Sequence, residues 1–149
     1  MTMEQKSCFF VVLSTLIAIC LPLTAVAVAQ QAADLEIATA TICREVVDRE
    51  PVDPGTSFEP SVGKLYCFTH VTGAQGATEI YHVWYFAESE RAVVTLQVKT
   101  ASWRTYSSKI IQPHEIGDWR VDVLGLEGDV LKVVHFQIKP QGEVAPPAE

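Results

Sequence analysis

The sequence has few basic residues and no cluster of them. It carries 11 Lys and Arg against 18 Asp and Glu, which gives a formal net charge of −7. Proteins that bind nucleic acids or anionic lipid surfaces present patches of Lys and Arg, because these patches neutralise phosphate groups. The sequence therefore argues against nucleic acid, and against a membrane surface, as the partner of the folded part of the chain.

The chain also lacks the motifs that usually mark an enzyme. No G-x-S-x-G motif surrounds Ser107 and Ser108, and the four histidines fall on separate segments. Nothing in the sequence brings a nucleophile, a base and an orienting group together. His82, which shares a strand face with a tryptophan, is expected to be a hydrogen-bonded core residue. No catalytic residue and no cofactor are predicted.

Cysteine is scarce, and its positions matter. Two of the four cysteines lie in the first 20 residues, which leaves Cys43 and Cys67 in the remainder. We predict that these two form a disulfide, because an exported chain enters an oxidising compartment. Two buried free thiols are the alternative. No metal site is predicted, because neither cysteine has another Cys or His at ligand spacing; a set of His82, His114 and Glu115 is the weaker alternative.

What the chain does contain at its start is a secretory signal. A basic residue, Lys6, precedes an apolar run over 9–23, and the small residues A-V-A-V-A follow at 25–29. We predict that residues 1–29 are a signal peptide and that the protein is exported. An uncleaved membrane anchor is the alternative, since the run is long enough to span a bilayer. A membrane is expected as a partner only in that case.

The rest of the chain has the pattern of an all-β domain. Short segments of alternating apolar and polar residues are separated by turn residues, which is typical of strands. The segment 35–51 also fits a helical stripe, and we interpret it as a strand because everything after it resembles strands. The stretch 51–63 is predicted to be a loop. The further strands are expected at 64–71, 79–86, 91–99, 102–111, 117–124 and 130–139.

Seven strands within residues 35–139 predict an antiparallel sandwich of the immunoglobulin or fibronectin kind. The tail at 140–149 has nothing to bury and is expected to be disordered. The predicted core aromatics are Trp84, Trp103 and Trp119, because each falls on the apolar face of its strand.

The stretch 101–124 holds the densest set of aromatic and charged residues. Its two strands, 102–111 and 117–124, are expected to lie together at the centre of the domain with their polar residues on one outward face. A solvated face with cross-strand ion pairs is the simplest interpretation of that row. The alternative is a binding surface, whose candidate residues are Arg104, Tyr106, Ser108, Lys109 and His114.

Several motifs resemble a known bacterial family. They are D-R-E-P-V at 48–52, V-G-K-L-Y-C-F-T at 62–69, H-V-W-Y at 82–85, S-W-R-T-Y-S-S-K at 102–109 and I-I-Q-P-H-E-I-G-D-W at 110–119. From 37 to 138 the chain resembles the exported family known as domain of unknown function 2914. The resemblance implies a small β domain in the periplasm or cell envelope of a bacterium. It implies no activity, so no site residue is carried over from it.

Three classes of function therefore stay open. A non-catalytic binding module for a protein or glycan partner is favoured, because exported β-sandwiches often present aromatic and planar polar side chains to such ligands. A structural or assembly domain of an envelope complex is the second class, and an enzyme the third. Exposure separates the first two: if Arg104 and Tyr106 lie together in an open groove, binding is favoured.

Overall fold

The computed structural model describes residues 35–140 of the chain. The signal-peptide prediction for residues 1–29 concerns residues outside this range, and so does the prediction for the tail at 140–149 apart from its first residue. Within it, the secondary structure is almost entirely β, and none of its elements is a helix with the length and apolarity needed to cross a bilayer.

Nine strands and one short 3-10 turn follow each other along residues 35–140. Seven of the strands are long, and they coincide with the segments expected from the alternating pattern. The elements are β1 (Glu36–Val47), β2 (Glu50–Pro54), β3 (Ser57–Phe58), the turn η1 (Pro60–Val62), β4 (Lys64–Thr72), β5 (Thr78–Phe86), β6 (Ser89–Val98), β7 (Ser102–Ile110), β8 (Gly117–Leu124) and β9 (Val130–Ile138).

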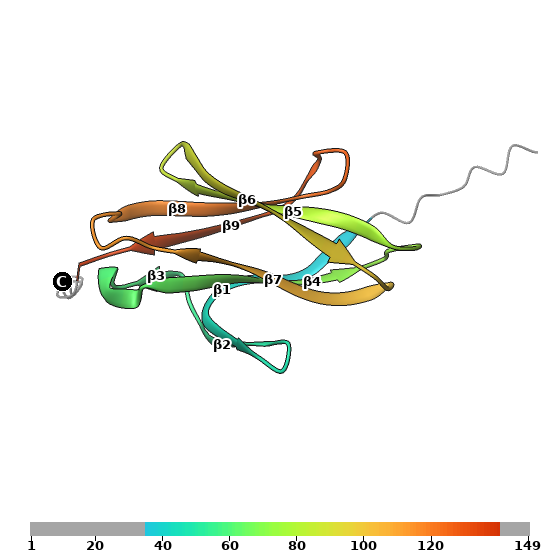
Figure 1. Ribbon diagram of the computed structural model, residues 1–149, viewed down its shortest axis with the longest axis horizontal. Helices are drawn as coiled ribbons and strands as arrows, with labels where there is room; N and C mark the ends of the chain where they lie inside the picture. The colour runs from blue at the N-terminus through green and yellow to red at the C-terminus, as the bar shows by residue number, and fades with distance from the viewer. Residues whose placement is uncertain (1–34, 141–149) are drawn as a thin grey trace, which may run out of the picture. The chain divides into compact units, whose positions relative to one another are not determined.

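The strands form two sheets that pack face to face (Figure 1). The four-stranded sheet has the order β2-β1-β4-β7, and the five-stranded sheet has the order β3-β9-β8-β5-β6. The connections β4–β5, β6–β7 and β7–β8 each cross from one sheet to the other, as is usual in immunoglobulin-like sandwiches. The predicted all-β sandwich is confirmed.

Large aromatic side chains fill the space between the sheets. Trp84 of β5 and Trp119 of β8 are buried, and their rings lie 6.2 Å and 5.8 Å from the ring of Phe136 on β9. Both positions follow from the period of two along a strand, which sends alternate side chains into the core. Trp103 differs from the prediction. It is only partly buried, because β7 is an edge strand and Trp103 lies at the margin of the core.

The two strands of the stretch 101–124 do not lie together. β7 belongs to the four-stranded sheet and β8 to the five-stranded sheet, so the loop between them crosses the sandwich. The outward faces of β7 and β8 therefore point away from each other. The single polar row expected from the sequence is in fact two separate surfaces, one with Arg104 and Tyr106 and the other with Asp118, Arg120 and Asp122.

Much of the stretch 51–63, which was predicted to be a loop, has regular secondary structure instead. β2 pairs with the end of β1 to form a hairpin, whose turn residues Asp48 and Arg49 have φ of 51° and 62°. Such left-handed dihedrals at both turn positions are typical of a two-residue hairpin, but the sequence lacks the usual Asn-Gly or Asp-Gly signal. Prolines 51 and 54 fit because β2 is an edge strand, where backbone donors are not all needed.

The hairpin leaves the sheet and lies across its outer face (Figure 1). Glu50 at the hairpin turn pairs with Arg104 on β7 at 2.9 Å, although two strands, β1 and β4, separate β2 from β7 in the sheet order. This covering accounts for the burial of Phe68, whose side chain shares the outer face with Tyr106 opposite it. The sandwich thus has a partial third layer on its four-stranded side.

The predicted disulfide between Cys43 and Cys67 is not formed. Both are free and buried. Cys67 lies opposite Ile42 in the sheet, whereas Cys43 lies opposite Tyr66, which is one position further along. Because successive side chains of a strand point to opposite faces, Cys67 points into the core and Cys43 to the outer face. Two cysteine side chains directed apart are not bridged without movement of the backbone.

Candidate functional site

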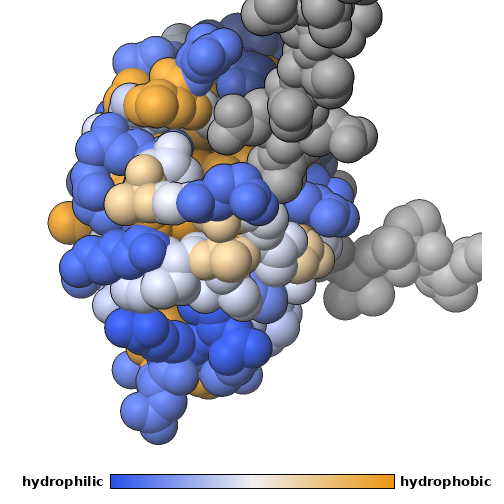
Figure 2. Space-filling model, turned by 90° about the vertical axis from the view of Figure 1, so that its right-hand side faces the viewer, coloured by the Kyte–Doolittle hydropathy of each residue, from blue (hydrophilic) through white to orange (hydrophobic). Residues whose placement is uncertain are grey.

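A groove of about 660 Å³ lies between the tip of the β1–β2 hairpin and the edge strand β7. We call it the hairpin groove; its lining includes Asp48, Arg49, Lys99, Trp103, Arg104 and Tyr106. Seen from the right-hand side of Figure 1, hydrophilic residues dominate the lower part of the molecule, on the side of the four-stranded sheet (Figure 2).

Cations surround the indole of Trp103. The guanidinium carbon of Arg49 lies 5.0 Å from the ring centroid, and the ammonium of Lys99 lies 5.9 Å from it. A positive group over an aromatic face is attracted by the negative charge density of the ring. The two contacts hold basic side chains from the hairpin and from the β6–β7 connection at the same side of β7.

Arg104 and Tyr106 stand side by side on the outer face of β7. Their side chains are both 46 % exposed. Tyr106 packs edge to face on Tyr66, with ring centroids 5.9 Å apart, so its ring is held in one orientation. Arg104 pairs with Glu50, which is itself 57 % exposed. An ion pair this open is weak, because water screens it, and a competing carboxylate displaces Glu50 at little cost.

The structure separates the other predicted binding residues from this pair. Ser108 is exposed on the same face of β7 but does not line the hairpin groove. Lys109 was predicted to face outward, and it instead follows the inward set of the strand; its ammonium donates to the carbonyl of Ile110 at 3.0 Å. His114 is exposed in the β7–β8 loop, outside the groove. The period of two along β7 places Arg104 and Tyr106 on the same outer face, and it places Lys109 on the opposite face.

A second groove, of about 770 Å³, lies where the β5–β6 turn meets β8 and β9. It is larger, but its charged side chains are already engaged with one another. Arg120 pairs with Glu88 and Asp122, both at 3.1 Å, and lies 4.1 Å from the ring centroid of Tyr85. Asp118 accepts a hydrogen bond from Gln137 at 2.7 Å. The hairpin groove is the better candidate, since Arg49 and Lys99 contact Trp103 there and form no ion pair with a described carboxylate.

A polar network is buried between the sheets. His82 of β5 contacts the hydroxyl of Thr69 through Nε2 at 2.9 Å and that of Ser107 through Nδ1 at 2.8 Å. Ser107 also accepts a hydrogen bond from Trp84 Nε1 at 3.0 Å. Burial lowers the pKa of His82 to about 4, so the ring is neutral at pH 7 and uses one nitrogen as donor and one as acceptor.

This network contains a serine within hydrogen-bond reach of a histidine, which is the pairing of an activated nucleophile. However, His82 and Thr69 are fully buried, Ser107 is 4 % exposed, and none of them lines either groove. The prediction that His82 is a hydrogen-bonded core residue is confirmed. Its two hydroxyl partners come from β4 and β7, so the network joins the two sheets.

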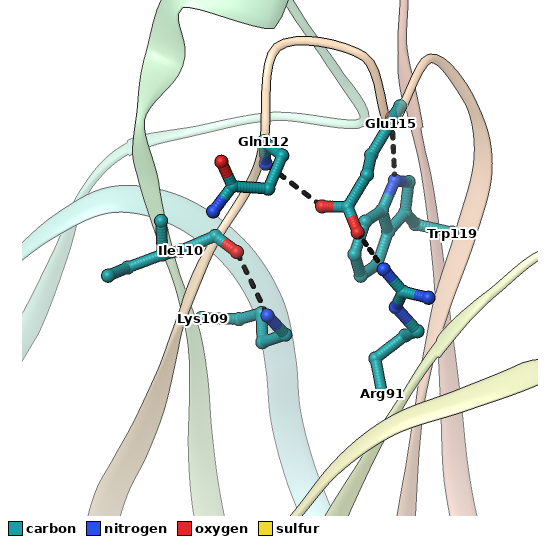
Figure 3. A network of polar contacts seen from close by, with 6 residues as sticks. All are labelled: Arg91, Lys109, Ile110, Gln112, Glu115 and Trp119. Carbon is teal, nitrogen blue, oxygen red and sulfur yellow. Dashed lines mark hydrogen bonds and ion pairs between the residues drawn. The ribbon is translucent and has the colours of Figure 1, made fainter.

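A buried carboxylate organises the loop that crosses from β7 to β8 (Figure 3). Glu115 is 1 % exposed, and its Oε2 accepts a hydrogen bond from the backbone N–H of Gln112 at 2.9 Å. Its Oε1 accepts a hydrogen bond from Arg91 Nη2, and its carbonyl accepts one from Trp119 Nε1 at 3.1 Å. Burial raises the pKa of Glu115, but the hydrogen bonds from Gln112 and Arg91 outweigh it and leave the pKa below the usual value.

The two thiols are shielded as well. Burial raises the pKa of Cys67 to about 12, and burial also raises the pKa of Cys43. Neither thiol is reactive in this form, because the thiolate is the nucleophile and the metal ligand. Among residues 35–140, no three His, Cys, Asp or Glu side chains gather in a way that would hold a metal ion.

Sequence reasoning missed the basic residues that complete the hairpin groove. Arg49 lies near the end of the segment 35–51, which was interpreted as one strand, and Lys99 lies at the end of another predicted strand, 50 positions further along the chain. Neither carries a local signal. Only the fold of the hairpin across the sheet brings Arg49 to Trp103.

Residues 77–138 match the family described as "Protein of unknown function (DUF2914)", a region that spans β5 to β9. The resemblance stated from the sequence is confirmed over these residues. A comparison with curated proteins found no match.

Proposed function

We propose, from the geometry of the chain itself, that the protein is a non-catalytic binding module of the bacterial envelope. Its ligand is an anionic protein or glycan, and the hairpin groove receives it. The family that residues 77–138 match is of unknown function, so it supplies no activity to this proposal.

One observation carries the proposal. Arg104 and Tyr106, two candidates from the sequence, line the hairpin groove together and are both 46 % exposed. A tyrosine offers an apolar face with a polar tip, and an arginine pairs with carboxylates in a fixed geometry. Residues of these types, accessible and held in place, are the usual anchors of binding surfaces.

The charge of the groove supports an anionic ligand. The chain has a net charge of −7, yet Arg49, Lys99 and Arg104 gather on this one surface. Asp48 and Glu50 are the nearby acidic residues, and Glu50 already pairs with Arg104. A cationic site on an acidic protein attracts anions locally, while the remaining surface repels them, which favours a ligand that enters at this site.

The test uses the full chain immobilised and exposed to envelope extract and to an array of acidic glycans. Arg104→Ala and Tyr106→Ala should abolish capture. Both should leave the free energy of unfolding within about 0.5–1 kcal/mol, because they change surface positions. Ser108→Ala is the matched control, since it is on the same face but outside the groove, and it should capture normally.

Two results would refute the proposal. Capture that survives both groove variants would place the ligand elsewhere. Unfolding caused by Arg104→Ala would mean that the Arg104–Glu50 pair is structural, and the groove would lose its role. A domain that captures nothing but assembles with copies of itself would instead support the second class, a structural or assembly domain.

A further inference from the structure

We propose that the free edge of β7 binds an extended acidic peptide as an added strand, with the basic residues of the hairpin groove contacting its carboxylates. This inference rests on the proposed function and narrows it to one class of partner. It starts from a difference between β7 and the other edge strands.

Each sheet ends in two edge strands, and three of the four are unsuited to pairing with another chain. β2 contains Pro51 and Pro54, which lack a backbone donor. β3 has two residues only. β6 carries a bulge, because Trp84 pairs with Ala92 and the next residue, Tyr85, pairs with Glu90. Prolines, short length and bulges are the devices by which proteins prevent edge-to-edge association.

β7 has none of these three devices, and its inward-facing Lys109 lies at the far end of the strand from the hairpin groove. It is nine residues long, contains no proline, and pairs with β4 from Ser102 to Ile110 without a shift in register. Among the described strands β4 is its one neighbour in the sheet, so the backbone donors and acceptors on its other side pair with no described strand. A long, regular, unpaired edge of this kind is the surface that binds peptides by strand addition.

The side chains around this edge fit an acidic sequence. Arg104 faces outward on β7, while Arg49 and Lys99 lie over Trp103 at 5.0 Å and 5.9 Å. In an added strand, alternate side chains face the same side, so acidic residues at every second position would meet Arg104. Arg49 and Lys99 add positive charge at the Trp103 side of the same edge. Glu50 on Arg104 shows that the site accepts a carboxylate.

A second copy of this chain fits the edge less well. The chain has a net charge of −7, and two copies repel each other as a whole. Pairing through β7 would also bring the two basic grooves together. An acidic peptide has no such conflict, because it meets the basic groove alone.

Fluorescence anisotropy with the full chain and a labelled peptide, T-E-V-E-V-E-V-E-T, tests the proposal. Two control peptides have Lys in place of each Glu, or Pro in place of the central residues. The first removes the complementary charge and the second prevents strand addition. The acidic peptide should bind at least about tenfold more tightly than either control, which corresponds to the loss of one strong contact.

Two substitutions act in opposite directions. Arg104→Ala should weaken the acidic peptide about tenfold. Glu50→Gln should tighten it by about threefold, because Arg104 no longer has an internal carboxylate to exchange. A purely structural role for Glu50 would not produce tighter binding. Lys132→Ala is the matched control, because it removes an exposed basic residue that lies on the other sheet. It should leave the affinity for the peptide unchanged.

The outcomes separate this inference from the proposed function. Equal binding of the acidic and proline peptides would overturn strand addition. No binding of any peptide, with capture from extract still lost in Arg104→Ala, would overturn the peptide class and leave the binding module standing. If Arg104→Ala reduced neither peptide binding nor capture from extract, both this inference and the proposed function would be overturned. A dimer in sedimentation that Arg104→Ala does not affect and that blocks the peptide would assign the edge to a second copy.

Discussion

Arg91 donates a hydrogen bond to Glu115 and so joins the edge of the five-stranded sheet to the loop that leaves the four-stranded sheet. Arg91 is the extra residue of the β6 bulge, since its neighbours Glu90 and Ala92 pair with successive residues of β5. A bulge redirects a side chain that regular pairing would leave on the sheet face. One inserted residue thus supplies the cation for a buried carboxylate whose other hydrogen-bond donor is the backbone N–H of Gln112.

Substitution of Arg91 is expected to destabilise the domain. Arg91→Ala leaves Glu115 with its backbone partner but without its counter-charge, which should lower the free energy of unfolding by about 1–3 kcal/mol. Urea unfolding followed by tryptophan fluorescence measures it. Glu88→Gln is the matched control, because it removes the exposed Arg120–Glu88 pair and should cost less than about 1 kcal/mol. Equal losses of stability in the two variants would show that the Arg91–Glu115 pair stabilises the domain no more than an exposed ion pair does.

The stability of the domain should fall as the pH drops from 6.5 to 4. The pKa of His82 is about 4 in the folded state and about 6.5 in the unfolded state, so the unfolded chain binds the proton more readily in this range. The loss is on the order of 3 kcal/mol at its full extent. Glu115 adds to the loss only below pH 4.5, since its folded pKa is lower than that value.

The variant His82→Gln should remove most of the pH slope between pH 6.5 and 4.5, measured as the change in urea midpoint with pH. The variant His114→Gln, at an exposed loop position, should keep the slope. A slope that persists in His82→Gln would show that other groups cause the acid sensitivity.

Cys43 and Cys67 should both be recovered as free thiols. Alkylation in denaturant, followed by mass analysis of the peptides, should find the two side chains fully modified without a reducing agent. Without denaturant both should be protected, because burial raises the pKa of each thiol and blocks access. A peptide pair linked through Cys43 and Cys67 would contradict the separation of the two side chains by the sheet.

The two tryptophans of the stretch 101–124 should differ in their contribution to stability. Trp119→Ala removes a side chain that is 1 % exposed and should cost about 3–5 kcal/mol. Trp103→Ala removes a partly buried ring at an edge strand and should cost about 1–2 kcal/mol. Thermal unfolding of the two variants provides the comparison, and equal costs would mean that Trp103 is a core residue in solution.

The alternating pattern predicts most of the sandwich because one face of each long strand is buried. In β6, for example, Ala92, Val94, Leu96 and Val98 alternate with exposed residues in the structure, as they do in the sequence. The pattern does not say which strands are neighbours. β7 and β8 follow each other in the chain, yet a six-residue loop carries the second to the opposite sheet. Within that loop, Glu115 accepts hydrogen bonds from Gln112 and Arg91, and a single glutamate has no distinctive sequence signal.

The disulfide prediction failed because Cys43 lies one residue away from the position that is opposite Cys67. Had Cys43 been at the position of Ile42, it would lie opposite Cys67, with both side chains on the core side. Register is set by contacts along the whole strand pair, including the bulge near Ala38, and no local feature of the cysteines reveals it. The candidate site is similar: Arg104 and Tyr106 follow from period two, but Arg49 depends on a hairpin that folds back over the sheet.

The strand order also has a consequence for how fast the chain acquires its structure. Three strand pairs, β1–β2, β5–β6 and β8–β9, join consecutive segments and close quickly. The pairs β1–β4, β4–β7 and β5–β8 join distant segments, and both sheets depend on them. Closing these long loops lowers the entropy of the chain before the strand contacts can stabilise it. Refolding from urea should therefore take milliseconds to seconds rather than microseconds. The β3–β9 pair, in which Ser57 lies opposite Gln137 (137 − 57 = 80 residues apart), is expected to be among the last to form.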